Sequence, residues 1–307
     1  MHMTDVLARD GMTASFEFFP PKTASAWDEF VASLHEFEAL KPSFTSVTYG
    51  AGGSTRDRTD ALVTRLAAET ALAPVPHLTC VGHTSAEVDS ILAAYAAKGV
   101  SNILALRGDA PRGAAAAAAG AGDFRFAVDL VRAVREFGNA GRHRDPRGFG
   151  IGVAGFPEGH AETPNTLVQM DHLKAKVDAG ADFVITQLFF DNDAFFDWRD
   201  RCVIAGVKIP VIAGIMPITS IAGLKRMAEL AAGTRFPAPL LRAIKRCEDD
   251  PASVANVGIH WATEQARDLI DRGVAGIHFY TLNKSDATRR IYQTLGLAGR
   301  VGAQGAG

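Results

Sequence analysis

A single carboxylate lies within an aromatic run near the start of the chain. Glu17 belongs to the segment SFEFFPP at residues 15–21. Side chains alternate along a strand, so Phe16 and Phe18 would point opposite to Glu17, which we expect to point into the interior of a barrel. Desolvation beside aromatic rings raises a carboxyl pKa, and this makes Glu17 a candidate general acid near neutral pH. The alternative is a structural ion pair with an interior Lys or Arg.

A cation, a glycine and an anion follow one another at the end of another β-rich run. Arg107 could hold a phosphate and Asp109 could stabilise a developing positive charge, with the flexible Gly108 between them. The alternative is a water-exposed ion pair in a loop, which stabilises little. Thr48 precedes a glycine-rich turn at residues 51–54, which would let a ligand approach the backbone closely. Such a turn alone indicates no ligand.

Isolated polar residues occur in three further β-rich runs. His77 and Gln187 each stand in apolar surroundings, and the alternative for both is a core residue whose polar atoms are satisfied internally. Tyr280 and Lys284 close the last run, with a core position as the alternative for Tyr280. The sequence has no histidine pair at spacing i, i+2 or i, i+4 and no carboxylate cluster, so we expect no metal centre.

One glycine motif resembles a nucleotide-binding turn. The run GIGVAG at residues 150–155 matches the pattern G-x-G-x-x-G, but it lies inside an expected strand and continues into Phe156 and Pro157. A dinucleotide-binding turn would open a helix at this point. We therefore interpret the run as strand.

The elements that must position these residues alternate between β-rich runs and helical patterns along the whole chain. Helical patterns include residues 86–98, 167–179 and 193–205, each followed by glycine, and an extra helix within 234–250. The expected strands are residues 15–19, 44–50, 75–82, 102–108, 149–155, 182–190, 210–216 and 276–283.

Eight strands with helical crossovers predict an α/β fold, a (β/α)8 TIM barrel of parallel strands. The carboxyl ends of such strands meet at one mouth, and the residues above fall at those ends. We expect one domain over residues 1–307, with loose termini at 1–11 and 298–307, and irregular stretches at 113–122 and 140–148. An open doubly wound sheet is the alternative.

Composition favours small-molecule chemistry. The 307 residues hold 32 Lys and Arg against 34 Asp and Glu, and this balance gives none of the positive charge that a nucleic-acid partner requires. The three cysteines, Cys80, Cys202 and Cys247, are far apart and predict neither a disulfide framework nor a zinc site. No apolar run approaches a membrane span, and residues 1–13 lack the apolar core of a signal peptide, so we expect a cytoplasmic protein with no membrane partner.

Eight phrases in order resemble the methylenetetrahydrofolate reductases, and together they cover nearly all of the chain. This resemblance implies a (β/α)8 barrel that holds FAD and reduces 5,10-methylenetetrahydrofolate to 5-methyltetrahydrofolate with NADH or NADPH. It also implies ping-pong transfer of a hydride through flavin N5, and a homo-oligomer. The phrases are FEFFPPK (16–22), SVTYGAGGSTRDRT (46–59), PHLTCVG (76–82), ILALRGD (103–109), FPEGH (156–160), KVDAGADFVITQLFFD (176–191), GIMPI (214–218) and HFYTLN (278–283).

The resemblance also implies roles for single residues. Glu17 matches the family's general acid, which assists opening of the substrate's five-membered ring to an iminium cation, and Asp109 matches a carboxylate near flavin and folate. Gln187 matches an amide that binds the pterin ring. The other positions matched to substrate are Thr48, Met227, Tyr280 and Lys284, and those matched to FAD are Thr48, His77, Arg107, Gly108, Asp109, Phe126, Ala127, Ala154, His160, His172 and Lys176.

Five positions depart from the better-known bacterial pattern. Met227 stands where an aromatic residue would stack on nicotinamide or folate, Gly223 where a glutamine would help bind, and Lys284 where an arginine occurs. Methionine can still pack on a ring, and lysine keeps the charge without the bidentate fork. Phe156 replaces a tyrosine near the flavin, and Gln169 replaces an acidic residue expected to hold the ribose.

Two other functions remain open from the sequence. A barrel lyase or aldolase could use Lys284 to form a Schiff base and would need no flavin. A non-catalytic ligand-binding barrel could keep the architecture without turnover, and the departures at Gly223 and Met227 leave room for it. The resemblance further implies that this chain has no regulatory domain of the eukaryotic kind, and so no regulation by S-adenosylmethionine through one.

Overall fold

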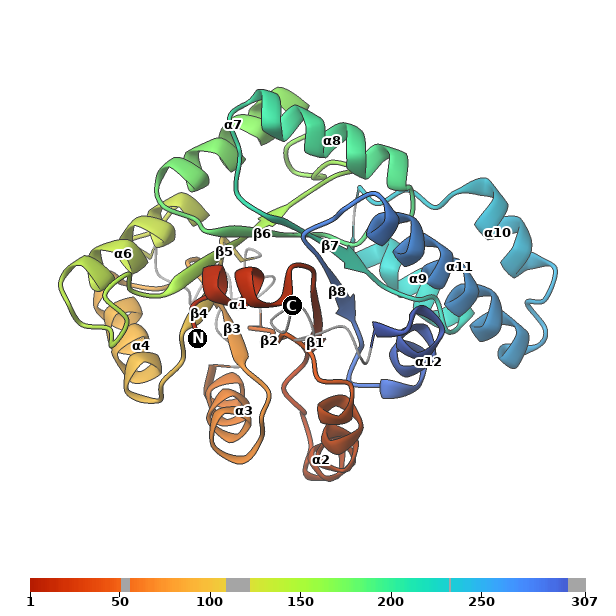
Figure 1. Ribbon diagram of the computed structural model, residues 1–307, viewed down its shortest axis with the longest axis horizontal. Helices are drawn as coiled ribbons and strands as arrows, with labels where there is room; N and C mark the ends of the chain where they lie inside the picture. The colour runs from red at the N-terminus through yellow and green to blue at the C-terminus, as the bar shows by residue number, and fades with distance from the viewer. Residues whose placement is uncertain (51–55, 109–121, 232, 298–307) are drawn as a thin grey trace.

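Eight parallel strands close a barrel in chain order in this computed structural model, which describes residues 1–50, 56–108, 122–231 and 233–297 (Figure 1). Each strand pairs with the next, and β8 pairs with β1 through Ser15 opposite His278 and Glu17 opposite Tyr280. The predicted (β/α)8 barrel is therefore confirmed. The strands are β1 (Thr13–Phe18), β2 (Phe44–Val47), β3 (Pro74–Thr79), β4 (Asn102–Leu106), β5 (Gly150–Gly155), β6 (Phe183–Thr186), β7 (Val211–Ile215) and β8 (Gly276–Tyr280).

Helices surround the barrel, and most begin at a side chain that caps their free N–H groups. Thr84 and Glu87 form a reciprocal capping box at the start of α4, and Asn165 and Asp191 cap α7 and α8. The described helices are α1 (Met3–Asp10), α2 (Ala24–Ala39), α3 (Arg56–Glu69), α4 (Ser85–Ala97), α6 (Ala127–Asn139), α7 (Thr166–Asp178), α8 (Asn192–Ile204), α9 (Ile221–Leu230), α10 (Ala238–Lys245), α11 (Pro251–Asp271) and α12 (Ser285–Leu295).

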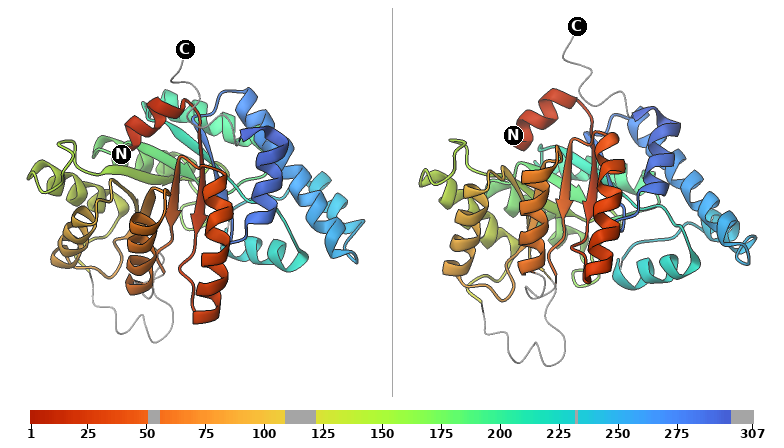
Figure 2. Two further views of the ribbon diagram at one scale, coloured as in Figure 1. Left: turned by 60° about the horizontal axis from the view of Figure 1, so that its bottom comes forward. Right: turned by 90° about the horizontal axis from the view of Figure 1, so that it is seen from below.

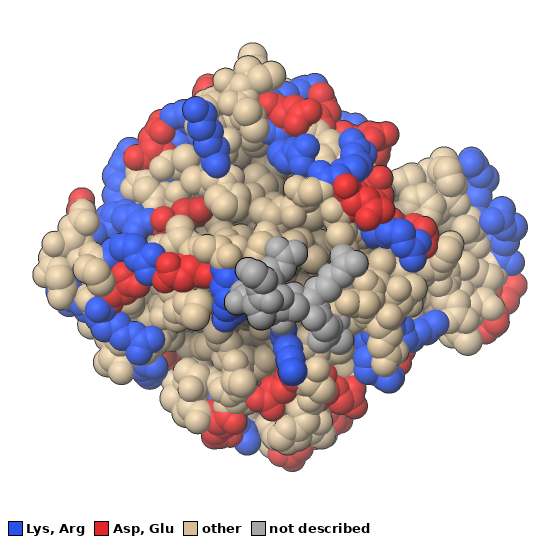
Figure 3. All heavy atoms as spheres, in the orientation of Figure 1, with Lys and Arg blue, Asp and Glu red and all other residues tan. Residues whose placement is uncertain are grey.

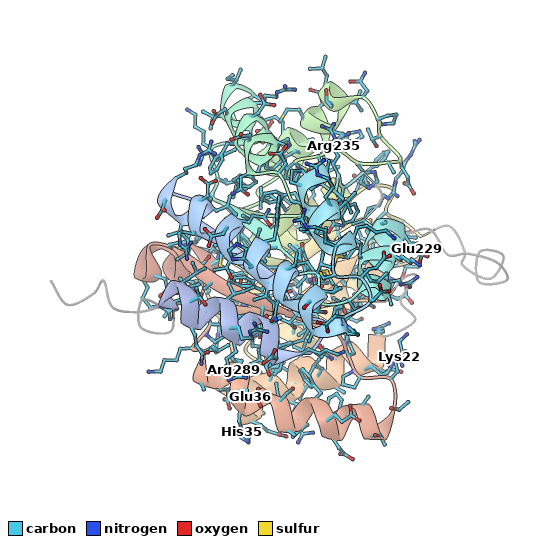
Figure 4. All side chains as sticks on the ribbon, turned by 90° about the vertical axis from the view of Figure 1, so that its right-hand side faces the viewer. Lys22, His35, Glu36, Glu229, Arg235 and Arg289 are labelled. Atoms are coloured by element: carbon cyan, nitrogen blue, oxygen red, sulfur yellow. The ribbon has the colours of Figure 1, made fainter. Side chains whose placement is uncertain are left out.

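Glycines follow the ends of three helices that the sequence predicted. Gly99, Gly180 and Gly206 follow α4, α7 and α8 with φ of +77°, +113° and +82°, a left-handed conformation that glycine adopts without steric cost. The last helix, α12, packs against α2 and so closes the ring of helices. The seam between α12 and α2 includes a hydrogen bond from the Ser285 hydroxyl to Glu36, which Figure 4 labels.

The first residues form a helix, which corrects the expectation of a loose terminus at residues 1–11. Met3 and Val6 of α1 are almost fully buried and pack in one apolar cluster with Phe44 and Phe183. Figure 2 shows α1 lying across one end of the barrel and α9 at the opposite end. The helix thus closes the amino-terminal end of the barrel. The other expected loose terminus, residues 298–307, lies outside the described residues, as does most of the stretch 113–122.

Several strands end earlier than predicted. β2 stops at Val47 and β6 at Thr186, although the predicted strands continued to positions 50 and 190. These extra residues leave the sheet at the carboxyl-end mouth, where apolar side chains line loops instead of a ladder. The predicted extra helix within 234–250 is shorter, because Pro237 starts α10 and Asp250 caps α11. Residues 140–148 are irregular, as expected.

Candidate active site

Glu17 points across the interior of the barrel. Its carboxylate Oε2 lies 3.6 Å from Nε2 of His77, and the side chains of Glu17 and His77 are 9% and 8% exposed. β1 pairs with β2, and β2 pairs with β3, so this contact reaches the next strand but one on the inner face of the barrel. The expected inward direction of Glu17 is confirmed. No Lys or Arg of the described residues forms an ion pair with it, which disfavours the alternative that its role is structural.

Burial removes the charge from both partners. It raises the pKa of Glu17 to about 8 and lowers the pKa of His77 to about 3. A carboxylic acid and a neutral imidazole therefore face one another at pH 7. The phenol of Tyr280 has its pKa raised well above 10 by burial and by the nearby Glu17 carboxyl. The arrangement can hold a proton in a dry cavity and release it to a stronger base.

A polar layer that the sequence did not reveal lies in the barrel beside this pair. His278 is fully buried, and its Nδ1 and Nε2 lie 2.8 Å and 3.2 Å from the hydroxyls of Ser15 and Ser46. Its ring stacks on Phe44, with centroids 5.9 Å apart. The signal that could have found this layer is the two-residue period, because Ser15 shares a face with Glu17 and His278 shares one with Tyr280.

Tyr280 is held over the end of β6. Its hydroxyl donates to the carbonyl of Thr186 at 2.7 Å. A Cβ on Gly214 would lie 2.8 Å from the Tyr280 ring, so the glycine makes room for it. Gln187 follows Thr186 at the mouth, and its Oε1 accepts from the backbone N–H of Leu188 at 2.9 Å. These contacts bring Tyr280 and Gln187 to the same rim.

A second group of predicted residues lies at the ends of β4 and β5. The guanidinium of Arg107 pairs with Glu162, whose backbone N–H donates to His160 at 3.2 Å. Lys176 on α7 donates to the carbonyl of Ala154 at 2.8 Å, and burial lowers its pKa to about 8. These two groups of contacts lie at the ends of the neighbouring strands β4 and β5, and we call Arg107, His160, Ala154 and Lys176 together the cationic rim.

An exposed aromatic ring extends this rim. Phe126, at the start of α6 before Ala127, is 41% exposed, and its ring centroid lies 5.9 Å from that of His172 on α7. The backbone N–H of Phe126 donates to Asp129 at 2.9 Å, which fixes where the helix begins. His160 also packs edge-on against Phe156, with centroids 4.6 Å apart.

Two backbone positions at the mouth are tightly constrained. Gly108 has φ +85°, and a Cβ there would lie 2.8 Å from Cβ of Thr79, so no larger residue fits without a shift. Thr48 is half-buried just past β2, with its N–H bonded to the carbonyl of Phe18 at 2.9 Å. Asp109, the other predicted catalytic carboxylate, lies outside the described residues.

Two positions matched to substrate, and the departure at Gly223, have no contact with the interior pair among those described. Met227 is 4% exposed and buried in an apolar cluster with Leu188, Met216 and Ile218, against which Tyr280 also packs. Lys284 is exposed just before α12, where it lacks the desolvated surroundings that activate a Schiff-base lysine. Gly223 lies on α9, where a Cβ would meet only the Ser220 hydroxyl, at 3.1 Å.

Glu158 is a titratable residue of the mouth that sequence reasoning did not single out. Burial raises its pKa to about 7, and its Oε2 accepts from the backbone N–H of Arg235 at 2.8 Å. This bond ties the loop after β5 to the stretch between α9 and α10, where Figure 4 labels Arg235. The residue's position inside FPEGH was the available signal.

The sequences of known proteins identify the family to which this chain belongs. The family model described as methylenetetrahydrofolate reductase matches residues 2–296. This chain belongs to the methylenetetrahydrofolate reductase family. The 5,10-methylenetetrahydrofolate reductase of Escherichia coli (strain K12) is 36% identical over 286 residues, which are 93% of this chain and 91% of that protein.

Other relatives differ in length. Methylenetetrahydrofolate reductase (NADH) 1 of Arabidopsis thaliana is 36% identical over 302 residues, 95% of this chain and 50% of the plant protein, so this chain spans about half the length of that relative. Among solved structures, an uncharacterised protein from Clostridium thermocellum, described as binding two copies of 5-methyl-5,6,7,8-tetrahydrofolic acid, has a TM-score of 0.66. It shares 14% identity, over 98% of this chain and 99% of that one, and this likeness shows the fold.

Two further observations concern membranes and nucleic acids as partners. No helix among the described residues is long and apolar enough to cross a membrane. Lys and Arg alternate with Asp and Glu around the face shown in Figure 3, so that face carries no patch of a single sign.

Proposed function

We propose that this protein reduces 5,10-methylenetetrahydrofolate to 5-methyltetrahydrofolate, with FAD as cofactor and NADH or NADPH as reductant. Membership of the reductase family supports the reaction. The observation that carries the proposal is the buried, protonated Glu17, whose pKa near 8 suits a general acid. The Arabidopsis relative is named for NADH, so NADH is the reductant to test first.

The residues present fit a flavin dinucleotide. Lys176 and Arg107 at the cationic rim are suited to phosphate oxygens. The exposed Phe126 ring beside His172 offers an aromatic surface for a planar group, and Gly108 allows close backbone approach. Ala127, Ala154, His160 and Thr48 complete the proposed contacts. When bound, the flavin supplies hydride transfer between nicotinamide and folate.

The chain's own residues would supply the proton and the orientation. Glu17 donates its proton to the folate nitrogen that leaves the one-carbon unit, which opens the five-membered ring to an iminium cation. Gln187 and Tyr280, on one rim beside the acid, would orient the pterin ring. Asp109 is proposed to stabilise the cation, and Met227 and Lys284 to contact the outer part of the folate. Because Met227 is buried in an apolar cluster, it would contact folate either by moving out of that cluster or through the small exposed part of its side chain.

The rival functions make different predictions. An aldolase through Lys284 would form a borohydride-trappable adduct without flavin, and the exposed position of Lys284 disfavours it. A non-catalytic barrel would bind folate without turnover. We also propose that the protein acts in the cytoplasm as a homo-oligomer, which sedimentation of the purified protein would test.

Anaerobic spectroscopy tests the function directly. Purified protein should be yellow or become so with FAD, should bleach on adding NADH or NADPH, and should regain its colour with 5,10-methylenetetrahydrofolate. Protein that ignores FAD, or reduced flavin that folate does not reoxidise, would refute the proposal. Menadione, a general electron acceptor, serves as the control because it reoxidises the flavin without needing a proton donor for folate.

A further inference from the structure

The pair of Glu17 and His77 contains an unsatisfied nitrogen. Nε2 of His77 is buried and has no hydrogen-bond partner, and Oε2 of Glu17 lies 3.6 Å away. Buried polar atoms in proteins are nearly always bonded, and catalytic hydrogen bonds are often long before substrate binds. At 3.6 Å the two atoms are just too far apart for a hydrogen bond, and a small approach would form one.

The burial of Glu17 and His77 determines which of the two would donate a hydrogen bond to the other. An ion pair would take two charges out of water in the barrel, and no described Lys or Arg compensates the carboxylate. Burial opposes both charges, so the carboxyl keeps its proton and the imidazole stays neutral. In a neutral pair the carboxyl O–H donates, and Nε2 must carry a lone pair to accept it.

The other groups facing Glu17 are already engaged. His278 of β8 meets a serine hydroxyl at each ring nitrogen, Ser15 on one side and Ser46 on the other. Tyr280, also of β8, donates its hydroxyl proton to Thr186. Among the described titratable groups near Glu17, His77 of β3 is the one that offers an unengaged nitrogen.

We propose that His77 is a positioning residue that holds the acid proton of Glu17. His77 is then the neutral tautomer with its proton on Nδ1, and its Nε2 accepts a hydrogen bond from the Glu17 carboxyl O–H. This inference rests on the proposed function for its kinetic part and changes the role of His77, which family resemblance gave to FAD. In turnover, the Glu17 O–H bond breaks as the new N–H bond forms on folate. A proton from solvent then restores the acid.

Histidine nuclear magnetic resonance tests the tautomer without flavin or folate. The side chains would be labelled with ¹⁵N, and His77 assigned by its loss in His77→Gln. We expect Nδ1–H with a bare Nε2 from about pH 6 to about pH 8, and a shift of Nε2 alone in Glu17→Leu. An Nε2–H tautomer or an imidazolium at His77 would overturn the proposal, even if the enzyme turns over folate.

Half-reaction kinetics separate proton holding from flavin contact. His77→Leu removes the acceptor, and His77→Gln keeps an amide near the Nε2 position. At saturating FAD, reoxidation by folate should fall about 10²-fold in His77→Leu and recover to within about tenfold in His77→Gln, with flavin reduction nearly unchanged. His143→Gln, a buried histidine that bonds the carbonyl of Val100, is the matched control and should leave both rates unchanged.

Two outcomes would count against this inference alone. Equal losses in His77→Leu and His77→Gln would show that no acceptor near the Nε2 position is needed, and equal losses in both half-reactions would make His77 a flavin contact. Either result would overturn the inference. Failure of folate to reoxidise the wild-type flavin would instead refute the proposed function, whatever tautomer His77 shows.

Discussion

At the scale of single residues, the barrel keeps an ionisable acid uncharged by enclosing it. Glu17 is surrounded by strands and meets His77 and Tyr280 instead of a cation. The cost of removing a carboxylate from water is avoided because the group holds its proton. The same enclosure would make that proton available to a substrate that fills the mouth and brings a basic nitrogen to Glu17.

Glu17 should make the stability of the protein depend on pH. Its pKa rises from 4.5 to about 8 on folding, so its contribution is complete below about pH 4.5 and is lost as pH rises toward 8. Glu17→Gln has no such group. Between about pH 5 and pH 8, the unfolding free energy of the wild type should fall by about 3 kcal/mol relative to this variant. Urea denaturation at several pH values would measure it, and parallel curves would contradict it.

The direction of Glu17 could be predicted, and the layer around it could not. Two-residue alternation in an aromatic run placed its side chain inside. The partnership with His77 depends on the stagger of β1 against β3, which no local pattern encodes. Met227 shows where family resemblance falls short of packing. The resemblance gave Met227 a substrate role, while packing places its side chain in an apolar cluster.

At the scale of elements, close backbone contacts position the loops around the mouth. Gly258 lies in the middle of α11, where a Cβ would stand 1.7 Å from the carbonyl oxygen of Ile218, just past β7. The helix can approach the barrel here only because glycine has no side chain. Gly223 on α9 has no comparable neighbour, since a Cβ would meet only a serine hydroxyl.

The two helical glycines should respond with opposite sign to the same substitution. In an open helix, Gly→Ala stabilises by about 1 kcal/mol, and we expect up to this gain for Gly223→Ala, with the Ser220 hydroxyl that caps α9 shifting slightly to admit the Cβ. Gly258→Ala should instead destabilise by about 2 kcal/mol or more, because α11 must move away from Ile218. Thermal or urea denaturation of the two variants gives the comparison. Stabilisation by Gly258→Ala would show that α11 moves at little cost.

Element types followed from the sequence, and their ends did not. Glycine caps located α4, α7 and α8 to within one residue, because left-handed termini require that residue. The strands β2 and β6 end early because Tyr49 after β2, and residues 188–190 after β6, are buried in loops at the mouth, where their sequence looks like strand. Composition alone cannot distinguish these two kinds of burial.

At the scale of the whole molecule, stability and chemistry lie at opposite ends of the barrel. α1 closes the amino-terminal end with Met3 and Val6, and the proposed acid, amide and cationic rim lie toward the other end. This division is the usual one for barrels of this kind. The sequence predicted the barrel from eight alternating units, but the short α1 lacked a long periodic pattern and was expected to be loose.

Met3→Ala should therefore weaken the fold and spare the chemistry. Met3 is fully buried in the apolar cluster that it forms with Val6, Phe44 and Phe183, so its truncation should cost about 2–5 kcal/mol of unfolding free energy. The rate of flavin reduction at a temperature well below unfolding should stay within about twofold of wild type. Loss of that rate in a folded variant would show that the two ends of the barrel are coupled.

The central claim is that Glu17 supplies the proton for folate and has no part in reducing the flavin. Anaerobic stopped-flow measurement of both half-reactions in Glu17→Gln, loaded with FAD, tests it most directly. We predict that NADH bleaches the flavin at nearly the wild-type rate, and that reoxidation by 5,10-methylenetetrahydrofolate slows by at least about 10²-fold. Equal slowing of both steps, or reoxidation at the wild-type rate, would contradict the account.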